Sequence, residues 1–132
     1  MAALSAYAAK LLLDWMLAGG SAPTRPPGQA VGLSTAVPSS VAGSEIATGS
    51  GYTRQSATFA SAASPAGSAS NSNSLSFGPF SNACTVSGAQ VWDTISATVG
   101  NMLLYGTLAT ARTLGVGDSL IFNAGSLVTT MA

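Results

Sequence analysis

The side chains that carry out acid–base, nucleophilic or metal chemistry are scarce in this sequence. It has no histidine and a single cysteine, Cys84. Its charged residues are Asp14, Glu45, Asp93, Asp118, Lys10, Arg25, Arg54 and Arg112. Histidine is the only side chain whose unperturbed pKa allows it to change charge near neutral pH, and it is the commonest metal ligand. Calcium sites cluster their acidic ligands, whereas these carboxylates lie far apart. We therefore predict no catalytic residue, no metal site and no cofactor, and we expect that the protein is not an enzyme.

Two features come closest to known binding or catalytic signatures. Residues 115–119 (GVGDS) contain Gly-x-Gly, but a dinucleotide loop needs a third glycine between a strand and a helix. This segment is more typical of a hairpin turn, with Asp118 as an ordinary turn residue. Cys84 has no cation beside it in sequence to lower its pKa. We therefore interpret it as a small buried apolar residue.

The charge of the chain limits its partners. Charged residues make up 6% of the sequence and the net charge is zero, whereas an average soluble domain has about 25%. Long-range attraction to nucleic acid or to an anionic membrane is therefore not expected. Lys10 and Asp14 interrupt the N-terminal apolar run, which is too short to span a bilayer. Because surfaces with net charge near zero tend to associate, the composition favours a subunit of an assembly.

An amphipathic helix is predicted over residues 3–17. Its apolar face is formed by Leu4, Tyr7, Leu11 and Trp15, at helical spacing. Glycines at 19–20 end the helix, and a proline-rich linker follows at 21–28. A helix this short is not stable alone, so its face must pack against something. We interpret that partner as the sheet of its own domain, with a neighbouring subunit as the alternative.

From residue 29 onward the pattern is that of short strands. The predicted strand segments are 29–35, 52–60, 73–78, 83–93, 101–109, 119–124 and 126–131. They predict a mainly β fold, an antiparallel β-sandwich or jelly roll of six to seven short strands with one N-terminal helix. We expect a single domain, 1–132, with the sandwich over 29–132. Long polar loops at 38–51 and 61–74 are flexible segments or ordered arms on a neighbour.

The aromatic residues of these strands are predicted to pack in the core, in preference to a platform for stacking sugars. They are Tyr52, Phe77, Phe80, Trp92, Tyr105 and Phe122. Trp15 is also expected in or beside the core. Arg54 is unusual, because a cation inside a strand needs a partner. We predict that it pairs with an acid or with backbone carbonyls, in its own fold or across an interface.

The order of these features resembles a group of small virion proteins of tailed bacteriophages. Residues 49–60 (GSGYTRQSATFA) look like the group's Gly-Gly-Tyr-x-Arg-Gln-x-x-x-Phe element. The segment from Gly100 to the C-terminus is similar to its Gly-Asn-Leu-Leu and Ala-Gly-x-Leu ending. Residues 85–93 (TVSGAQVWD) depart from the group, whose members tend to carry Trp-Gly-Thr and a histidine-containing strand there. The resemblance implies a β-rich part of the virion, and members are described as tail-fibre, minor tail or head proteins.

We therefore expect a non-enzymatic structural protein of the virion. The favoured role is a capsid decoration, or cement, protein that contacts the major capsid protein or other virion subunits and is a homo-oligomer in the particle. The alternative is a tail or tail-fibre-attachment protein, and a third candidate is a carbohydrate-binding module. Neither nucleic acid nor a membrane is expected as a partner. The candidate interface residues are Leu4, Leu11, Trp15 and Arg54.

Overall fold

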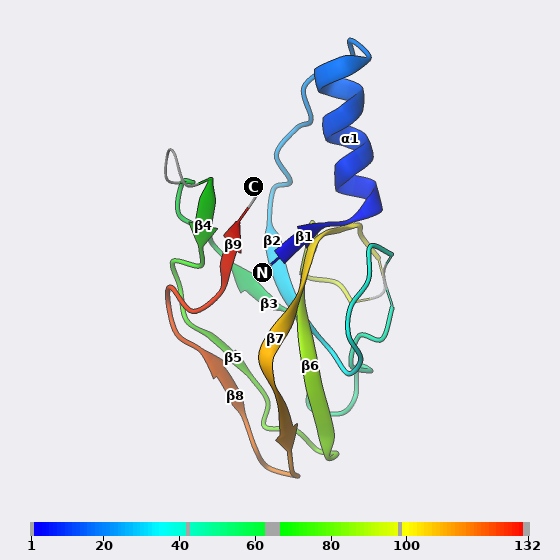
Figure 1. Cartoon of the computed structure of the whole chain (residues 1–132). Helices are drawn as coiled ribbons and strands as arrows, with labels where there is room; N and C mark the ends of the chain where they lie inside the picture. The colour runs from blue at the N-terminus through cyan, green and yellow to red at the C-terminus, as the bar shows by residue number, and fades with distance from the viewer. Residues whose placement is uncertain (1, 42, 63–66, 98, 131–132) are drawn as a thin grey trace.

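The computed structural model describes residues 2–41, 43–62, 67–97 and 99–130, and its strands form two layers. The strands are β1 Ala2–Leu4, β2 Gln29–Ser34, β3 Gln55–Ala57, β4 Ser68–Ser70, β5 Leu75–Phe77, β6 Cys84–Trp92, β7 Met102–Leu114, β8 Leu120–Phe122 and β9 Val128–Thr130. The first layer is an antiparallel sheet of order β1-β7-β6-β2-β3. The pairs β4–β9 and β5–β8 lie across from it (Figure 1). The predicted mainly β fold is confirmed, and the two layers are arranged as in a sandwich.

Every predicted strand segment overlaps a strand, although β7 continues to Leu114, beyond the predicted end at residue 109. The described residues hold two more strands that the prediction missed. Strand β1 lies where the helix was predicted to begin, and its three residues pair with β7. Strand β4 lies in the predicted loop 61–74, where it pairs with β9; residues 63–66 of that loop lie outside the described residues. Both strands are too short and too rich in Ala or Ser to show an alternating pattern.

The other predicted loop, 38–51, is partly tied to the body of the protein. Glu45 forms a β-bridge with Ser34, and the amide of Ile46 donates to the carbonyl of Leu33 at 3.0 Å. The Ile46 side chain is buried in the core. This part of the loop is therefore neither a flexible segment nor an arm on a neighbour; residue 42 lies outside the described residues.

The core fills the space between the two layers. Its buried members include Val31, Leu33, Tyr52, Leu75, Phe77, Phe80 and Val86. The ring of Phe77 stacks on Tyr52 and meets the edge of Phe122, with centroids 6.1 Å apart in both pairs. Trp92 is buried as well, so the predicted core role is confirmed for Tyr52, Phe77, Phe80, Trp92 and Phe122. It is wrong for Tyr105, which is only half-buried and does not belong to the core. Cys84 packs against this core, and burial raises the pKa of its thiol.

One glycine of the Gly-Ser-Gly-Tyr segment is required by the packing of two distant loops. Gly51 has a φ of +75°, a conformation that favours glycine. A Cβ at this position would lie 2.1 Å from the carbonyl oxygen of Pro79. The amide of Ser81 also donates to the carbonyl of Ser50 at 2.8 Å, which holds the same two loops together. The turn therefore brings Tyr52 to the core only because residue 51 has no side chain.

The helix α1 spans Ala6–Leu17, so the predicted start at residue 3 is wrong. Ser5 is its N-cap, and the Ser5 hydroxyl accepts from the amide of Ala8 at 3.1 Å. The same hydroxyl donates to the carbonyl of Met102, and the Ser5 amide donates to Leu103 at 2.9 Å. These bonds fix the start of α1 to the start of β7. No helix in the described ranges combines the length and the apolar character that crossing a membrane requires.

Candidate interaction surface

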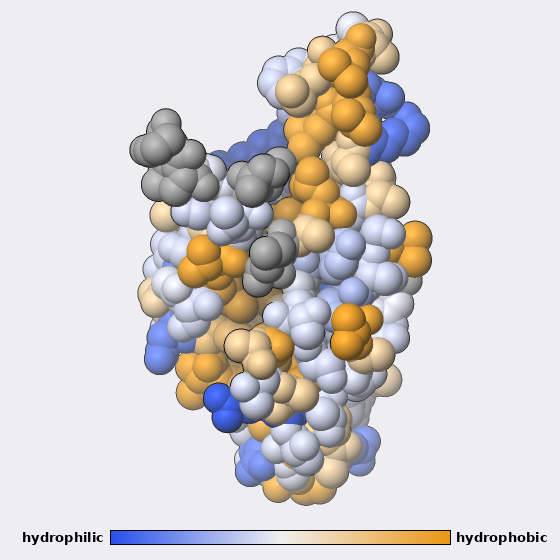
Figure 2. All heavy atoms as spheres, viewed as in Figure 1, coloured by the Kyte–Doolittle hydropathy of each residue, from blue (hydrophilic) through white to orange (hydrophobic). Residues whose placement is uncertain are grey.

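Helix α1 stands away from the two-layered body, and an extended segment, residues 18–28, returns from its tip to β2 (Figure 1). Ala8 is the only buried residue of the helix. Its exposed large apolar side chains, which are 36–78% accessible, are Tyr7, Leu11, Leu13, Trp15, Met16 and Leu17. Figure 2 shows hydrophobic residues gathered over this helix. The projecting helix therefore presents an apolar surface that its own sheet does not cover.

The polar part of α1 is a single narrow stripe. Lys10 and Asp14 lie one turn apart and form an exposed ion pair. At 100° per residue, the exposed apolar side chains occupy the rest of the circumference. A helix that is apolar nearly all round is normally buried. The expectation that α1 covers its own sheet is wrong, because the bonds at Ser5 direct the helix away from the body. A neighbouring subunit remains as the alternative.

The structure separates the four candidate interface residues. Leu11 and Trp15 lie together on α1, and Trp15 is 45% exposed, so its predicted place in or beside the core is wrong. Leu4 belongs to β1, where it pairs with Leu104 of β7, and not to the face of α1. Arg54 is only 2% exposed and lies in the interior of the protein. Of the four candidates, Leu11 and Trp15 are therefore the two that lie exposed on α1.

Arg54 forms an ion pair with Glu45 inside the protein. The sequence predicts that this cation needs a partner. Its Nε donates to Glu45 Oε1 at 2.8 Å, and its Nη2 donates to Glu45 Oε2 at 2.7 Å. The guanidinium also lies 3.7 Å from the centre of the Trp92 ring. Its Nη1 donates to the carbonyl oxygens of Thr94, Ser96 and Val99, at 3.2, 2.7 and 3.2 Å. The predicted pairing with an acid and with carbonyls is confirmed, within the protein's own fold, and it fixes the loop between β6 and β7.

The same carboxylate also binds Tyr52. The Tyr52 hydroxyl donates to Glu45 Oε1 at 2.7 Å and accepts from the amide of Leu33 at 2.9 Å. Gly32 makes room for this contact, since a Cβ there would lie 2.7 Å from Glu45 Oε1 and 2.9 Å from the Tyr52 hydroxyl. Sequence reasoning did not single out Glu45, although it is the acid nearest to Arg54 in the chain. We name Glu45, Tyr52, Arg54 and Trp92 the buried polar cluster.

The buried polar cluster predicts a loss of stability at alkaline pH. Burial, together with the hydrogen bond to Glu45, raises the pKa of Tyr52 well above its ordinary value. The unfolded tyrosine ionises at about pH 10, whereas the folded one stays protonated, so this contribution to stability is complete below that pH and declines above it. In urea titrations from pH 7 to 11, Tyr52→Phe should lose about 1–3 kcal/mol at pH 7 and show a weaker decline at high pH than the parent. Tyr7→Phe, at an exposed position, should reproduce the parent, and an equal alkaline decline in Tyr52→Phe would contradict the assignment.

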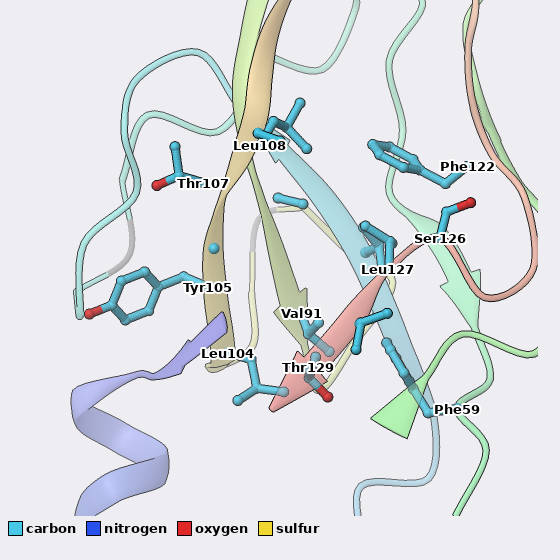
Figure 3. A pocket seen from close by; sticks show the side chains of 15 residues that line it. Phe59, Val91, Leu104, Tyr105, Thr107, Leu108, Phe122, Ser126, Leu127 and Thr129 are labelled. Atoms are coloured by element: carbon cyan, nitrogen blue, oxygen red, sulfur yellow. The ribbon is translucent and has the colours of Figure 1, made fainter. Parts of the chain in front are cut away.

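A cleft of about 280 Å³ opens between the two layers. In Figure 3, Leu104 and Leu108 of β7 form one wall, and Leu127 and Thr129 lie opposite, with Phe59 at one side. The side chains that line the cleft are all uncharged and mostly apolar. An adjoining hollow shares Phe59, Leu104 and Thr129 with it and is bordered by Arg25. The protein thus has an uncharged cleft as well as an uncovered apolar helix.

The chain was compared with known protein families. A family model described as podophage GP4 fiber I protein gp80 matches residues 3–130. The match includes α1, the buried polar cluster and both layers of the sandwich. None of the curated proteins matches the chain.

Proposed function

Because this chain belongs to the family of the podophage GP4 fiber I protein gp80, which makes it a structural component of a tailed-phage virion, we propose that it is a fibre- or tail-associated subunit. In this proposal it attaches to a neighbouring subunit through α1 and its role is not enzymatic. The family description refers to a fibre, so it supports the alternative role suggested by the sequence better than capsid decoration.

The exposed apolar surface of α1 is the observation that carries the proposal. Leu13, Met16 and Leu17 are more than half exposed. The hydrogen bonds that join the helix to the body lie at its start, from the amides of Ser5 and Ala6 to the carbonyls of Leu103 and Ser40. Exposing so many large apolar groups in water is unfavourable, at about 25 cal/mol per Å² of apolar surface. A subunit that is permanently bound to a neighbour avoids this exposure. The buried polar cluster supports the role indirectly, since it stiffens the body from which α1 projects.

The structure weakens the third candidate, a carbohydrate-binding module. Trp92 is the largest aromatic side chain of the strands, and a sugar-stacking platform requires an accessible aromatic face. It is buried, and the guanidinium of Arg54 lies over its ring. Trp92 is therefore a part of the core and has no free face for a sugar.

The location of the protein in the particle tests the proposal. We expect gold-labelled antibodies against this protein to bind at the tail or its fibres, with at most a few dozen copies per particle. Quantitative mass spectrometry of separated heads and tails should find the protein in the tail fraction. Label spread over the whole capsid, at hundreds of copies per particle, would contradict the proposal and restore the capsid decoration role.

A further inference from the structure

We propose that the buried polar cluster includes a binding site for one water molecule, held between Gln90 and Trp92. Both side chains belong to β6, and only 1% and 6% of their surfaces are exposed. The Gln90 Oε1 and Trp92 Nε1 atoms have no hydrogen-bond partner among the residues that the structure describes. Because nearly all buried polar atoms in proteins are hydrogen-bonded, to protein groups or to ordered water, these two atoms mark a binding site.

The register of β6 with β2 places both atoms over the same face of the sheet. Gln90 and Trp92 are two residues apart, so their side chains lie on the same side of the strand. Their partners on β2 are Gly32 and Ala30, which have the smallest side chains of that strand. A Cβ at Gly32 would lie 3.2 Å from Trp92 Nε1 and 2.7 Å from Glu45 Oε1. The indole nitrogen and the carboxylate therefore border the same small space above Gly32.

The two unpaired atoms require a ligand that both accepts and donates a hydrogen bond. The indole N–H of Trp92 can only donate, whereas the side-chain oxygen of Gln90 can only accept. Water accepts from the first and donates to the second, and it has one hydrogen left. Glu45 accepts two bonds from Arg54 and one from Tyr52, and a carboxylate offers about four lone-pair positions. The second hydrogen of the water thus has an acceptor, which completes the roughly three hydrogen bonds that are typical of a buried water.

Neither a direct bond to the carboxylate nor a metal ion satisfies both atoms. A small shift of Trp92 toward Glu45 would give the indole N–H an acceptor, but it would leave Gln90 Oε1 without a donor. The donors of Arg54 are already bound to Glu45 and to carbonyls of the loop between β6 and β7. A metal ion could bind Gln90 Oε1, but the indole N–H and the guanidinium over the Trp92 ring would repel it.

The water extends the buried polar cluster to the loop that covers it. Gln90 Nε2 donates to the carbonyl of Gly43 at 3.0 Å, and Glu45 follows two residues later in the same loop. Gln90 therefore joins this loop to β6 directly through Gly43, and through the water to Glu45.

Water–protein NOE and ROE spectra of the isotope-labelled full-length protein test this site. The chain has two tryptophans, and the variant Trp15→Gln identifies which indole signal belongs to Trp15. A bound water gives cross-peaks of opposite sign in the two spectra, whereas exchange with bulk water gives the same sign in both. We expect opposite signs for the buried indole of Trp92, and either equal signs or no cross-peak for the exposed indole of Trp15. Equal signs at Trp92, or no water cross-peak there, would overturn the inference.

Two variants identify the groups that hold the water. Tyr52→Phe removes a hydroxyl whose exchanging proton can imitate water, and the cross-peak should persist; its loss would assign the signal to that hydroxyl and overturn the inference. Gln90→Met removes the acceptor and should lose the cross-peak, whereas the matched control Gln55→Met, whose side-chain amide binds Thr53, should keep it. A folded Gln90→Met protein with an unchanged cross-peak would also overturn the inference. Thermal melting checks that each variant is folded, and the spectra of the parent decide alone if Gln90→Met does not fold.

Discussion

Replacing Arg54 with alanine is expected to lower the free energy of unfolding by about 3–5 kcal/mol, as measured by urea denaturation. The substitution leaves the Glu45 carboxylate without its bidentate partner in a largely buried position. It also removes the donor that binds three carbonyls of the loop between β6 and β7. We therefore expect the amide hydrogens of residues 94–97 and of Val99 to exchange faster in this variant than in the parent.

A second ion pair, also among the described residues, supplies the control for Arg54. Lys10 and Asp14 pair on the surface of α1, with side chains 75% and 50% exposed. Exposed pairs of this kind contribute at most about 0.5 kcal/mol, so Lys10→Ala should leave stability nearly unchanged. The double variant Arg54→Ala with Glu45→Ala should be more stable than Arg54→Ala alone, because it removes the unpaired charge. Equal losses of unfolding free energy in Arg54→Ala and Lys10→Ala would show that the buried polar cluster does not stabilise the fold.

Replacing Trp15 with glutamine is expected to reduce incorporation into virions at least tenfold while the protein itself stays folded. Trp15 is nearly half exposed on a helix that its own body does not cover, so the free energy of unfolding should change by less than about 0.5 kcal/mol. In the assembled particle this side chain is proposed to be buried against a neighbour. Truncating a large aromatic residue at the centre of an interface commonly weakens the binding free energy by about 2 kcal/mol or more.

Incorporation of Trp15→Gln is measured by complementing a phage that lacks the gene and quantifying the protein in purified particles. Val116→Gln serves as the matched control, since Val116 is an exposed apolar residue far along the chain from α1. If Trp15→Gln melts like the parent and also enters virions like the parent, α1 is not the attachment element. Loss of stability in the isolated variant would instead show that the helix packs on its own body.

The helix illustrates what the sequence could and could not predict. Its spacing of apolar residues located α1 correctly to within three residues at the start, because periodicity depends on local geometry. The same pattern cannot tell which surface covers the apolar face. That depends on Ser5, whose bonds to the start of β7 join residues about a hundred positions apart. The expectation that Trp15 lies in or beside the core was wrong for this reason.

The buried polar cluster also has one part that the sequence predicted and another that depends on the folded structure. A cation inside a predicted strand was enough to predict that Arg54 needs an acid or carbonyls, since burying an unpaired charge is costly. The choice of Glu45 among the acids depends on the β-bridge between Glu45 and Ser34 and on the space left by Gly32. Both are properties of the folded sheet. Strand β4 was missed because the Ser-Ala-Ser segment becomes a strand only through its pairing with β9.

The projecting arm is joined to the sheet at two strands, β1 and β2, and this determines how the protein bears mechanical load. The arm, α1 and residues 18–28, begins at β1 and returns to β2, and these strands are separated in the sheet by β7 and β6 (Figure 1). A pull on the tip of α1 is therefore divided between two strands of one sheet and passes along the strands into their ladders. Interstrand hydrogen bonds that are loaded along the strands share the force and must break together. The arm thus acts as a tether anchored in the five-stranded sheet, and we expect its resistance to force to be set by the rate at which that sheet unfolds.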